Sequence, residues 1–317
     1  MSLVTRILGR RGLSGFGHAS TAEEVTHGLN LRGQTILITG VSSGLGAESA
    51  RVLHQRGARI LGVARTQATA ARACEAWGPD AVPLACDLSE PSSVRTCVET
   101  IETLGIKLDV ILCNAGIMAL PKRELRYGQE LQFLTNHIGH FLLVTGLLER
   151  LTERGRVVML SSAAHEFAPP KTGIQLGDLT LEHNYDPWVA YGQSKLANLL
   201  FARGLARRFS GSQRTANALH PGVISTGLSR HMGPFINIGA PLLSRLFWKN
   251  VGQGAATQCY LAAHPGAAGV NGEYFADCNI AKPSRFGRDD QLAQRLWETT
   301  ERIVAELPAY QMPGTSR

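Results

Sequence analysis

A tyrosine and a lysine stand four residues apart in the stretch YGQSK, residues 191–195. The surrounding residues are patterned as a helix, so Tyr191 and Lys195 are expected on one helix face, one turn apart. A free tyrosine has a pKa of about 10, and a nearby cation lowers it. The pair therefore suits a proton donor and acceptor. Because a surface helix shows the same spacing by chance, other motifs must decide between the two interpretations.

A glycine-rich turn, TGVSSGLG (39–46), lies between a predicted strand and a predicted helix. Its GxxxGxG spacing would let the backbone turn tightly and present the helix N-terminus to a pyrophosphate. The segment Gly40–Gly44 also fits G-x-S-x-G, the nucleophile elbow of α/β-hydrolases. Against that remote alternative, the turn follows the first strong strand, so no earlier sheet would present the serine. A hydrolase would also leave Tyr191 and Lys195 without a role.

Two polar residues follow the second and third predicted strands. Arg65 stands 25 residues after Gly40 (65 − 40), where an NAD-preferring site would offer an acid to the ribose hydroxyls. An arginine there can bind a 2′-phosphate in a bidentate way and favours NADP, whereas the alternative is a solvated loop arginine. Asp87 would accept a hydrogen bond from the adenine amino group, or cap the following helix.

Short apolar runs alternate with helical patterns along the chain, which predicts an α/β fold. The runs are continuous, so we expect strands buried on both faces of a parallel sheet. We predict a single doubly wound Rossmann domain whose seven-stranded parallel sheet has the order 3-2-1-4-5-6-7, with helices on both faces. The expected strands are 34–39, 59–64, 81–86, 108–113, 156–161, 215–219 and 272–276. The clearest expected helices span about 128–152, 188–209, 251–263 and 289–306.

Three segments depart from this alternation. Residues 1–32 form an N-terminal extension before a catalytic domain at 33–310; basic residues within 1–22 leave an organellar presequence as the alternative to a segment packed on the domain. Residues 165–187 are an irregular insertion. Residues 223–250 are rich in large apolar side chains after a strand's C-terminal end, which predicts a substrate lid or ordinary packing against the sheet.

Bulk composition is that of a globular protein, with 44% hydrophobic and 18% charged residues. The net charge of +7 is spread along the chain, so nucleic acid is not an expected partner, and no apolar run is long enough to span a membrane. Six cysteines lack metal-type spacing and indicate reduced thiols, hence a cytoplasmic or organellar protein. No metal site is predicted, because no ligand carboxylate or cysteine accompanies the histidines at 137, 140 and 165.

Taken together, these motifs resemble the short-chain dehydrogenase/reductase family across nearly the whole chain. TNHIGHF (135–141), YGQSKLAN (191–198) and GEYF (272–275) are most similar to its retinol-dehydrogenase-like branch. STAEEVTHG (20–28) and NIAKP (279–283) resemble soluble relatives, including plastid translocon-associated dehydrogenases and their bacterial counterparts. The other matching elements are TGVSSGLG (39–46), CDL (86–88), NAG (114–116), MLSSAAH (159–165) and HPGVIST (220–226).

The resemblance implies a role for each catalytic residue. Tyr191 is the general acid when a carbonyl is reduced, and Lys195 lowers its pKa and hydrogen-bonds the nicotinamide ribose. Ser162 polarises the substrate oxygen; Ser161 is the less favoured candidate, because the second serine of this pair is usually catalytic. Asn136 would hold a water that links Lys195 to solvent. Ser162 and Tyr191 are 29 residues apart (191 − 162), wider than in compact family members because of the 165–187 insertion.

The resemblance also implies a nicotinamide cofactor site, and Arg65 favours NADP(H) over NAD(H) there. The segment 114–116 would lie against its adenosine side, and Pro221, Gly222 and Thr226 at its nicotinamide end. The full set of expected cofactor contacts is Gly40, Ser42, Ser43, Gly44, Leu45, Gly46, Arg65, Asp87, Leu88, Asn114, Ala115, Gly116, Tyr191, Lys195, Pro221, Gly222 and Thr226.

The expected activity is the NADP(H)-dependent interconversion of an alcohol and a lipophilic ketone or aldehyde, by a monomer or homo-oligomer. The alternative from another class is an NADP(H)-binding interaction or redox-sensing protein with incidental activity. The intact Ser-Tyr-Lys set favours the enzyme.

Overall fold

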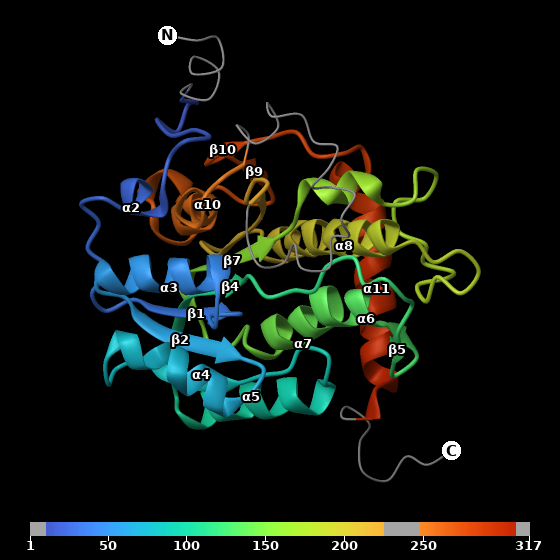
Figure 1. The fold of residues 1–317 in the computed structure, drawn as a ribbon, viewed down its shortest axis with the longest axis horizontal. Helices are drawn as coiled ribbons and strands as arrows, with labels where there is room; N and C mark the ends of the chain where they lie inside the picture. Colours follow the sequence, from blue (N-terminus) through green and yellow to red (C-terminus); the bar gives the residue numbers. More distant parts are fainter. Residues whose placement is uncertain (1–10, 225–247, 309–317) are drawn as a thin grey trace.

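The computed structural model describes residues 11–224 and 248–308 (Figure 1). Its main sheet has eight strands in the order β10-β9-β8-β7-β4-β1-β2-β3. The seven predicted strands all form, in the predicted order and parallel. The eighth, β10, pairs antiparallel with β9 and was not predicted, because two residues carry no apolar run. The strands of this sheet are β1 (Thr35–Thr39), β2 (Arg59–Ala64), β3 (Val82–Ala85), β4 (Leu108–Cys113), β7 (Leu151–Leu160), β8 (Thr215–His220), β9 (Tyr274–Ala276) and β10 (Asn279–Ile280).

Two hydrophobic cores lie on the two faces of the sheet. In β1, Leu37 faces one core while Ile36 and Ile38 face the other, which explains why the strand is an unbroken apolar run. Helices cover both faces, as a doubly wound fold requires (Figure 1). One face carries α5 (Pro91–Thr103), α7 (Gly139–Gly146), α8 (Pro187–Arg208) and α11 (Asp290–Glu306); the other carries α2 (Ala22–Val25), α3 (Gly44–Gln55), α4 (Gln67–Cys74) and α10 (Val251–Ala263).

The helix expected at 128–152 differs from the prediction. A small ladder of β5 (Leu125–Arg126) and β6 (Gln129–Glu130) comes first, and the helix is then built from α6 (Leu131–Phe133), the π-helical turn η2 (Leu134–Ile138) and α7. The helix ends at Gly146, and β7 already begins at Leu151. The helical spacing of Leu147, Leu148 and Leu151 imitates a longer helix, but Leu151 pairs with Leu108 of β4.

Short 3-10 turns connect other elements: η1 (Glu75–Trp77), η3 (Ala163–Phe167), η6 (Pro265–Ala267) and η7 (Phe286–Arg288). After η3 the insertion is irregular, as predicted. It is tied to the domain by the Gln175 amide, which donates to Gln193 Oε1 at 2.8 Å, and by the Tyr185 hydroxyl, which donates to the Leu120 carbonyl at 2.8 Å.

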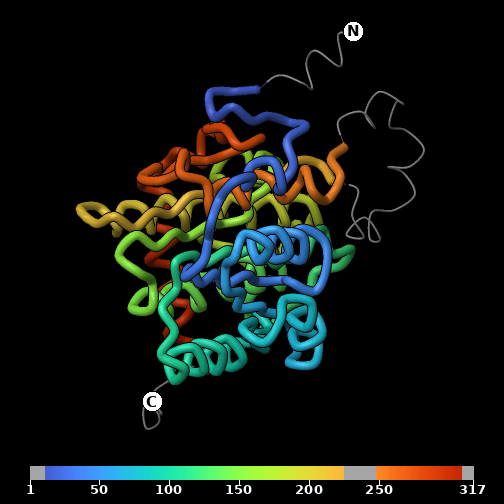
Figure 2. Tube along the Cα trace, turned by 90° about the vertical axis from the view of Figure 1, so that its left-hand side faces the viewer, coloured from blue at the N-terminus to red at the C-terminus, as the bar shows by residue number. Residues whose placement is uncertain are grey.

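The described part of the N-terminal extension packs against α10 and β10, two elements from the C-terminal part of the sequence (Figure 2). The Ser14 amide donates to Asn279 Oδ1 at 3.1 Å, and Asn279 Nδ2 donates to the Phe16 carbonyl at 3.1 Å. The Phe16 ring meets Tyr260 of α10 edge to face, with centroids 5.9 Å apart. Residues 1–10 lie outside the described residues.

The predicted lid at about 223–250 falls mostly outside the described residues, which include only 223–224 and 248–250 of it. None of the helices in the described part of the chain is both long enough and apolar enough to cross a membrane.

Candidate active site

The helix α8 carries both Tyr191 and Lys195. It begins at Pro187 because Asp186 caps it, accepting hydrogen bonds from the Trp188 amide at 2.8 Å and the Val189 amide at 2.9 Å. Lys195 Nζ lies 5.7 Å from the centroid of the Tyr191 ring. The two side chains therefore share one face of α8, as their spacing requires.

Ser162 follows β7 and faces the same point. A hydrogen bond links its side chain to that of Tyr191, and its Oγ also accepts from the Ala164 amide at 3.1 Å. Ser161 is buried and donates to the Lys195 carbonyl at 2.7 Å, so its hydroxyl is used in holding β7 against α8. Of the two serines, only Ser162 is positioned to bind a substrate oxygen beside Tyr191.

The His165 side chain hydrogen-bonds the backbone of Ser162. Its Nε2 accepts a hydrogen bond from the Ser284 amide at 3.0 Å, so the proton is on Nδ1, which lies 2.6 Å from the Ser162 carbonyl oxygen. Sequence reasoning assigned no role to His165, since nothing local indicates that Ser284 lies beside it in the fold.

Burial shifts both ionisable groups toward their neutral forms. Loss of hydration raises the pKa of Tyr191 to about 12, with the Ser162 hydrogen bond acting in the opposite direction. Loss of hydration also lowers the pKa of Lys195 to about 8. The shift of Tyr191 is opposite to the one expected from a neighbouring ammonium, because loss of hydration is its largest cause. At neutral pH the phenol is thus protonated, as a proton donor must be.

Asn136 lies in the π-helical turn η2 and is fully buried. Its Oδ1 accepts from the Ile117 amide at 2.8 Å, and its Nδ2 donates to the Ile117 carbonyl and to Ser194 Oγ, both at 2.9 Å. A Cβ placed on Gly116 would lie 2.9 Å from Asn136 Oδ1 and 3.4 Å from Lys195 Nζ. The glycine therefore leaves open the space between these two side chains.

Lys195 Nζ itself donates to the carbonyl of Leu160, at 3.1 Å. Asn198 Nδ2 donates to the same carbonyl at 3.1 Å. These bonds fix the ammonium beside the end of β7, next to Ser162.

The turn after β1 fits a pyrophosphate. Gly40 and Gly44 adopt φ of +76° and +58°, which favour glycine, and a Cβ on Gly46 would lie 2.2 Å from the Gly40 carbonyl oxygen. Ser43 is the N-cap of α3 but its side chain caps no amide, and both it and Ser42 are exposed. The first amides of α3 are thus left without a side-chain cap, as an anion-binding helix N-terminus requires.

The two polar residues predicted to select and bind the nucleotide follow the ends of β2 and β3. Arg65 is exposed after β2 and makes no hydrogen bond or ion pair with residues 11–224 or 248–308. Asp87 Oδ1 accepts from the Ser89 amide at 2.9 Å and from Ser89 Oγ at 2.7 Å. Asp87 does not cap α5, whose N-cap is Glu90. Leu88 is buried in the core.

The hydroxyl of Thr39, at the end of β1, holds the turn after β4. It accepts hydrogen bonds from the amides of Asn114 at 2.9 Å and Ala115 at 3.0 Å, and Asn114 Nδ2 donates to the Thr39 carbonyl at 2.9 Å. The carbonyl of Leu45 accepts from Gln258 Nε2 at 3.1 Å. Sequence reasoning missed Thr39, because its role depends on β1 and β4 being neighbours in the sheet.

At the expected nicotinamide end, Gly222 adopts φ of +96° after the buried Pro221. A Cβ on Gly222 would lie 2.6 Å from Cδ of Lys249, whose buried Nζ pairs with Asp277 Oδ1 at 2.5 Å. Sequence reasoning missed this ion pair. Thr226 lies outside the described residues.

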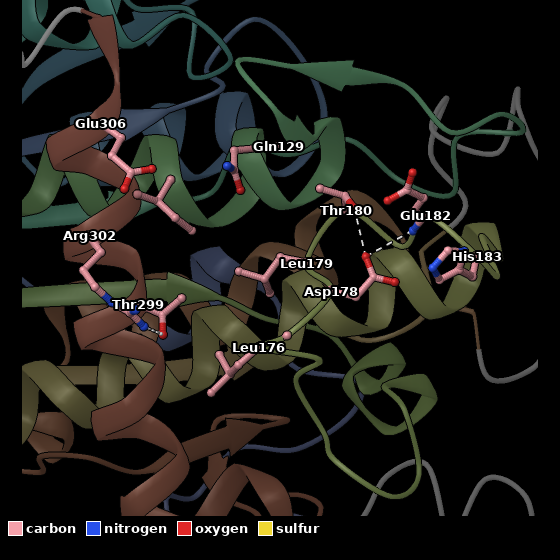
Figure 3. Close-up of a pocket in the computed structure, with 12 residues that line it drawn as sticks. Gln129, Leu176, Asp178, Leu179, Thr180, Glu182, His183, Thr299, Arg302 and Glu306 are labelled. Carbon is pink, nitrogen blue, oxygen red and sulfur yellow. Dashed lines mark hydrogen bonds between the residues drawn. The ribbon is translucent and has the colours of Figure 1, made fainter. Parts of the chain in front are cut away.

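A separate groove of about 570 Å³ lies between the insertion and α11 (Figure 3). Asp178 in this groove accepts hydrogen bonds from the Thr180 hydroxyl at 2.9 Å and the Glu182 amide at 3.1 Å. None of the predicted site residues lines it. The candidate site therefore remains at Ser162 and Tyr191, away from this groove. Within the described part of the chain, no three His, Cys, Asp or Glu side chains cluster as a metal site.

The carboxyl ends of parallel strands thus bring together a glycine turn that fits a phosphate and a Ser-Tyr-Lys set whose lysine is buried. This arrangement defines a Rossmann-type oxidoreductase with a nicotinamide cofactor. Comparison with known proteins identifies the family. Residues 34–173 match the family described as short chain dehydrogenase. The chain belongs to the short-chain dehydrogenase/reductase family, in the branch that holds the retinol dehydrogenases and their plastid relatives. A nucleophile elbow at Gly40–Gly44 is thereby excluded.

Two curated relatives show the range of this branch. The chain is 41% identical to short-chain dehydrogenase TIC 32 B, chloroplastic, of Brassica napus, over 97% of this chain and 100% of the relative. It is 37% identical to retinol dehydrogenase 14 of Mus musculus, over 87% of both chains.

Solved structures show the same fold. An uncharacterized protein from Mycobacterium paratuberculosis is 33% identical, with a TM-score of 0.71, over 90% of this chain and 97% of that one. A blue fluorescent protein from a metagenomic library, solved in complex with NADPH, is 26% identical with a TM-score of 0.61, over 78% and 97% of the two chains.

Proposed function

We propose that this protein interconverts an alcohol and a ketone or aldehyde with NADP(H). The observation that carries the proposal is the set of half-buried Ser162 and Tyr191 and buried Lys195, beside a glycine turn that fits a dinucleotide. When bound, the nicotinamide cofactor supplies the hydride in reduction and accepts it in oxidation.

The side chains of the site supply the remaining chemistry. Ser162 hydrogen-bonds the substrate oxygen and stabilises the negative charge that develops there during reduction. Tyr191 gives its phenolic proton to that oxygen, or takes a proton from the alcohol in the reverse direction. Lys195 places a positive charge near the phenolate. Asn136 holds a water that links Lys195 to solvent, so that the proton lost by Tyr191 can be replaced. Spectrophotometric turnover of NADPH with a panel of lipophilic aldehydes and ketones tests the reaction class; no turnover with any of them would contradict it.

NADP(H) is the preferred cofactor in this proposal, with Arg65 as the residue that recognises the 2′-phosphate. Its supports are the exposure of Arg65 next to the glycine turn and its lack of a partner within the described residues. The Gly40 amide donates to the Val63 carbonyl at 2.9 Å, so the turn lies directly beside the end of β2. A guanidinium that is free to turn toward a phosphate suits this task.

Replacing Arg65 with alanine should weaken NADPH binding roughly 10- to 100-fold and leave NADH binding within about twofold, because a hydrogen bond to a charged group contributes about 1.5–3 kcal/mol. Dissociation constants from nucleotide fluorescence measure both effects. Arg72→Ala, an exposed arginine later on α4, is the matched control and should change neither constant. Equal losses for NADPH and NADH in Arg65→Ala would show that Arg65 does not read the phosphate.

We propose a lipophilic substrate, because two aromatic side chains continue outward from Tyr191. The Trp188 ring lies 6.2 Å from that of Tyr191, and the Phe167 ring lies 6.2 Å from that of Trp188. Phe167 is 56% exposed, and Val223, directly after Gly222, is 57% exposed. Exposed apolar groups beside a catalytic centre lower the free energy of a complex with an apolar ligand. The name retinol dehydrogenase among the relatives agrees with this substrate class.

Along a series of straight-chain aldehydes, kcat/KM should rise by up to about fourfold for each methylene, since burying one contributes about 0.8 kcal/mol. Phe167→Asp should remove most of this dependence through KM, whereas Leu104→Asp, an equally exposed apolar site at the end of α5, is the control and should keep it. A flat series in the unmodified protein, or a preference for small hydroxy acids, would contradict the lipophilic site while leaving the hydride chemistry intact.

The alternative of a redox-sensing protein finds little support in the thiols. All six cysteines are free and buried, so none offers an accessible thiolate. A cofactor-binding interaction protein would bind NADPH tightly but reduce no member of the carbonyl panel.

We propose a cytoplasmic or organellar location, and the comparison favours the organellar alternative. The supports are Arg6, Arg10 and Arg11 in the opening residues and the chloroplastic names of two relatives. Fusing residues 1–32 to a fluorescent reporter in the source cell tests it, and a reporter that stays in the cytoplasm would contradict an organellar presequence.

A further inference from the structure

A buried histidine joins the cofactor side of the site to the proton-transfer side. His140 lies on α7 and is fully buried. Its Nε2 is 3.0 Å from the hydroxyl of Thr39, at the end of β1. Its Nδ1 is 2.9 Å from the backbone oxygen of Asn136, in the π-helical turn.

The hydrogen bonds of Thr39 decide where the imidazole proton is. The Thr39 oxygen accepts from two backbone amides, those of Asn114 and Ala115, so both lone pairs are used. Its own proton must therefore go to His140 Nε2, which has to be the unprotonated nitrogen. His140 then carries its proton on Nδ1 and donates it to the Asn136 carbonyl. An imidazolium would direct a second N–H at a saturated oxygen and break this chain.

His137, in the π-helical turn directly before α7, provides a contrast. Its Nε2 lies 3.0 Å from the Thr300 hydroxyl of α11, which donates its own proton to the Leu296 carbonyl at 2.8 Å. The proton of His137 is therefore on Nε2, and its Nδ1 has no partner in the described structure. His137 packs the core against α11, whereas His140 bridges two parts of the active site.

We propose that His140 is a positioning residue which, as the neutral Nδ1–H tautomer, holds Thr39 and the π-helical turn of Asn136 in register. This inference rests on the proposed function, because Thr39 orders the turn after β4 for the cofactor and Asn136 orders the proton path. A change at His140 should therefore act on both sides of the site without touching substrate or cofactor.

Two substitutions separate the two bonds. The amide of His140→Gln reaches the place of Nε2 and can accept from Thr39, while the amide of His140→Asn reaches the place of Nδ1 and can donate to Asn136. We expect His140→Gln to keep NADPH affinity and lose roughly three- to tenfold in kcat. We expect His140→Asn to keep kcat and lose a similar factor in NADPH affinity, and His140→Leu to lose both. A structural defect alone would not divide in this way between the two variants.

His137→Leu is the matched control, since it removes a buried imidazole of the same helical stretch and should lower the melting temperature without changing kcat or NADPH affinity of the folded protein. Nitrogen-15 NMR of the unmodified protein gives a readout that needs neither turnover nor a stable variant. We expect His140 as the Nδ1–H tautomer and His137 as the Nε2–H tautomer. His140 as the Nε2–H tautomer or as imidazolium at neutral pH would overturn the proposal, as would His140→Leu with kcat and NADPH affinity within about twofold of the unmodified protein.

If no carbonyl is turned over, the proposed function fails by itself. The His140 bridge is still tested by the tautomer and by NADPH affinity in His140→Asn and His140→Gln.

Discussion

Replacing Tyr191 with phenylalanine should reduce turnover by roughly 10²–10⁴-fold, the range that a positioned general acid contributes. The substitution keeps the ring and removes only the hydroxyl that bonds Ser162. NADPH affinity should stay within about threefold, because the glycine turn and Lys195 are unchanged. Steady-state kinetics with an aldehyde and fluorescence titration with NADPH measure the two quantities separately.

Tyr185→Phe is the control for this experiment. Tyr185 lies in the insertion and donates its hydroxyl proton to the Leu120 carbonyl, so it loses the same atom without touching Ser162 or Lys195. We expect a small loss of stability and near-normal kcat. Near-normal turnover in Tyr191→Phe would exclude Tyr191 as the proton donor and with it the proposed mechanism.

The elements that the sequence predicted well are those decided by local patterns. The strand β1 is an unbroken apolar run because successive side chains enter two different cores, and that pattern is visible without a structure. The same holds for α8, where Asp186 and Pro187 mark the start and the i, i+4 spacing places Tyr191 and Lys195 together. The placement of Tyr191 beside Lys195 could therefore be predicted from the local pattern.

The parts that escaped prediction depend on contacts between distant residues. His140 and Thr39 are 101 positions apart, and Lys249 and Asp277 meet only because β9 follows β8 in the sheet. The π-helical turn is likewise invisible in the pattern of LTNHI, which reads as ordinary helix. The direction of the Tyr191 pKa shift was missed for the same reason. It is set by burial, which depends on the whole fold, whereas the neighbouring lysine is visible in the sequence.

Two buried histidines should make the protein lose stability in mild acid. Burial lowers the pKa of His137 to about 3 and that of His140 to about 4, and each lies at most 1% exposed. In the unfolded chain both return to about 6.5. Between these values the unfolded state binds protons that the folded state excludes, so acid favours unfolding. The stabilisation is complete above about pH 6.5 and is lost as the pH falls toward 4.

Urea unfolding at pH 7, 6 and 5 measures this loss. Each histidine should contribute up to about 1.4 kcal/mol per pH unit to the fall in the free energy of unfolding once the pH is well below 6.5. Glu130, whose pKa is raised by burial, binds a proton more readily in the folded state and so opposes this trend as the pH falls, which is why the comparison with a histidine variant is needed. His137→Leu should start less stable at pH 7 but show a slope smaller by about one proton, because one titrating group is gone. An unmodified protein with constant stability from pH 7 to 5, or a His137→Leu variant with an unchanged slope, would show that these imidazoles are not held neutral by the fold.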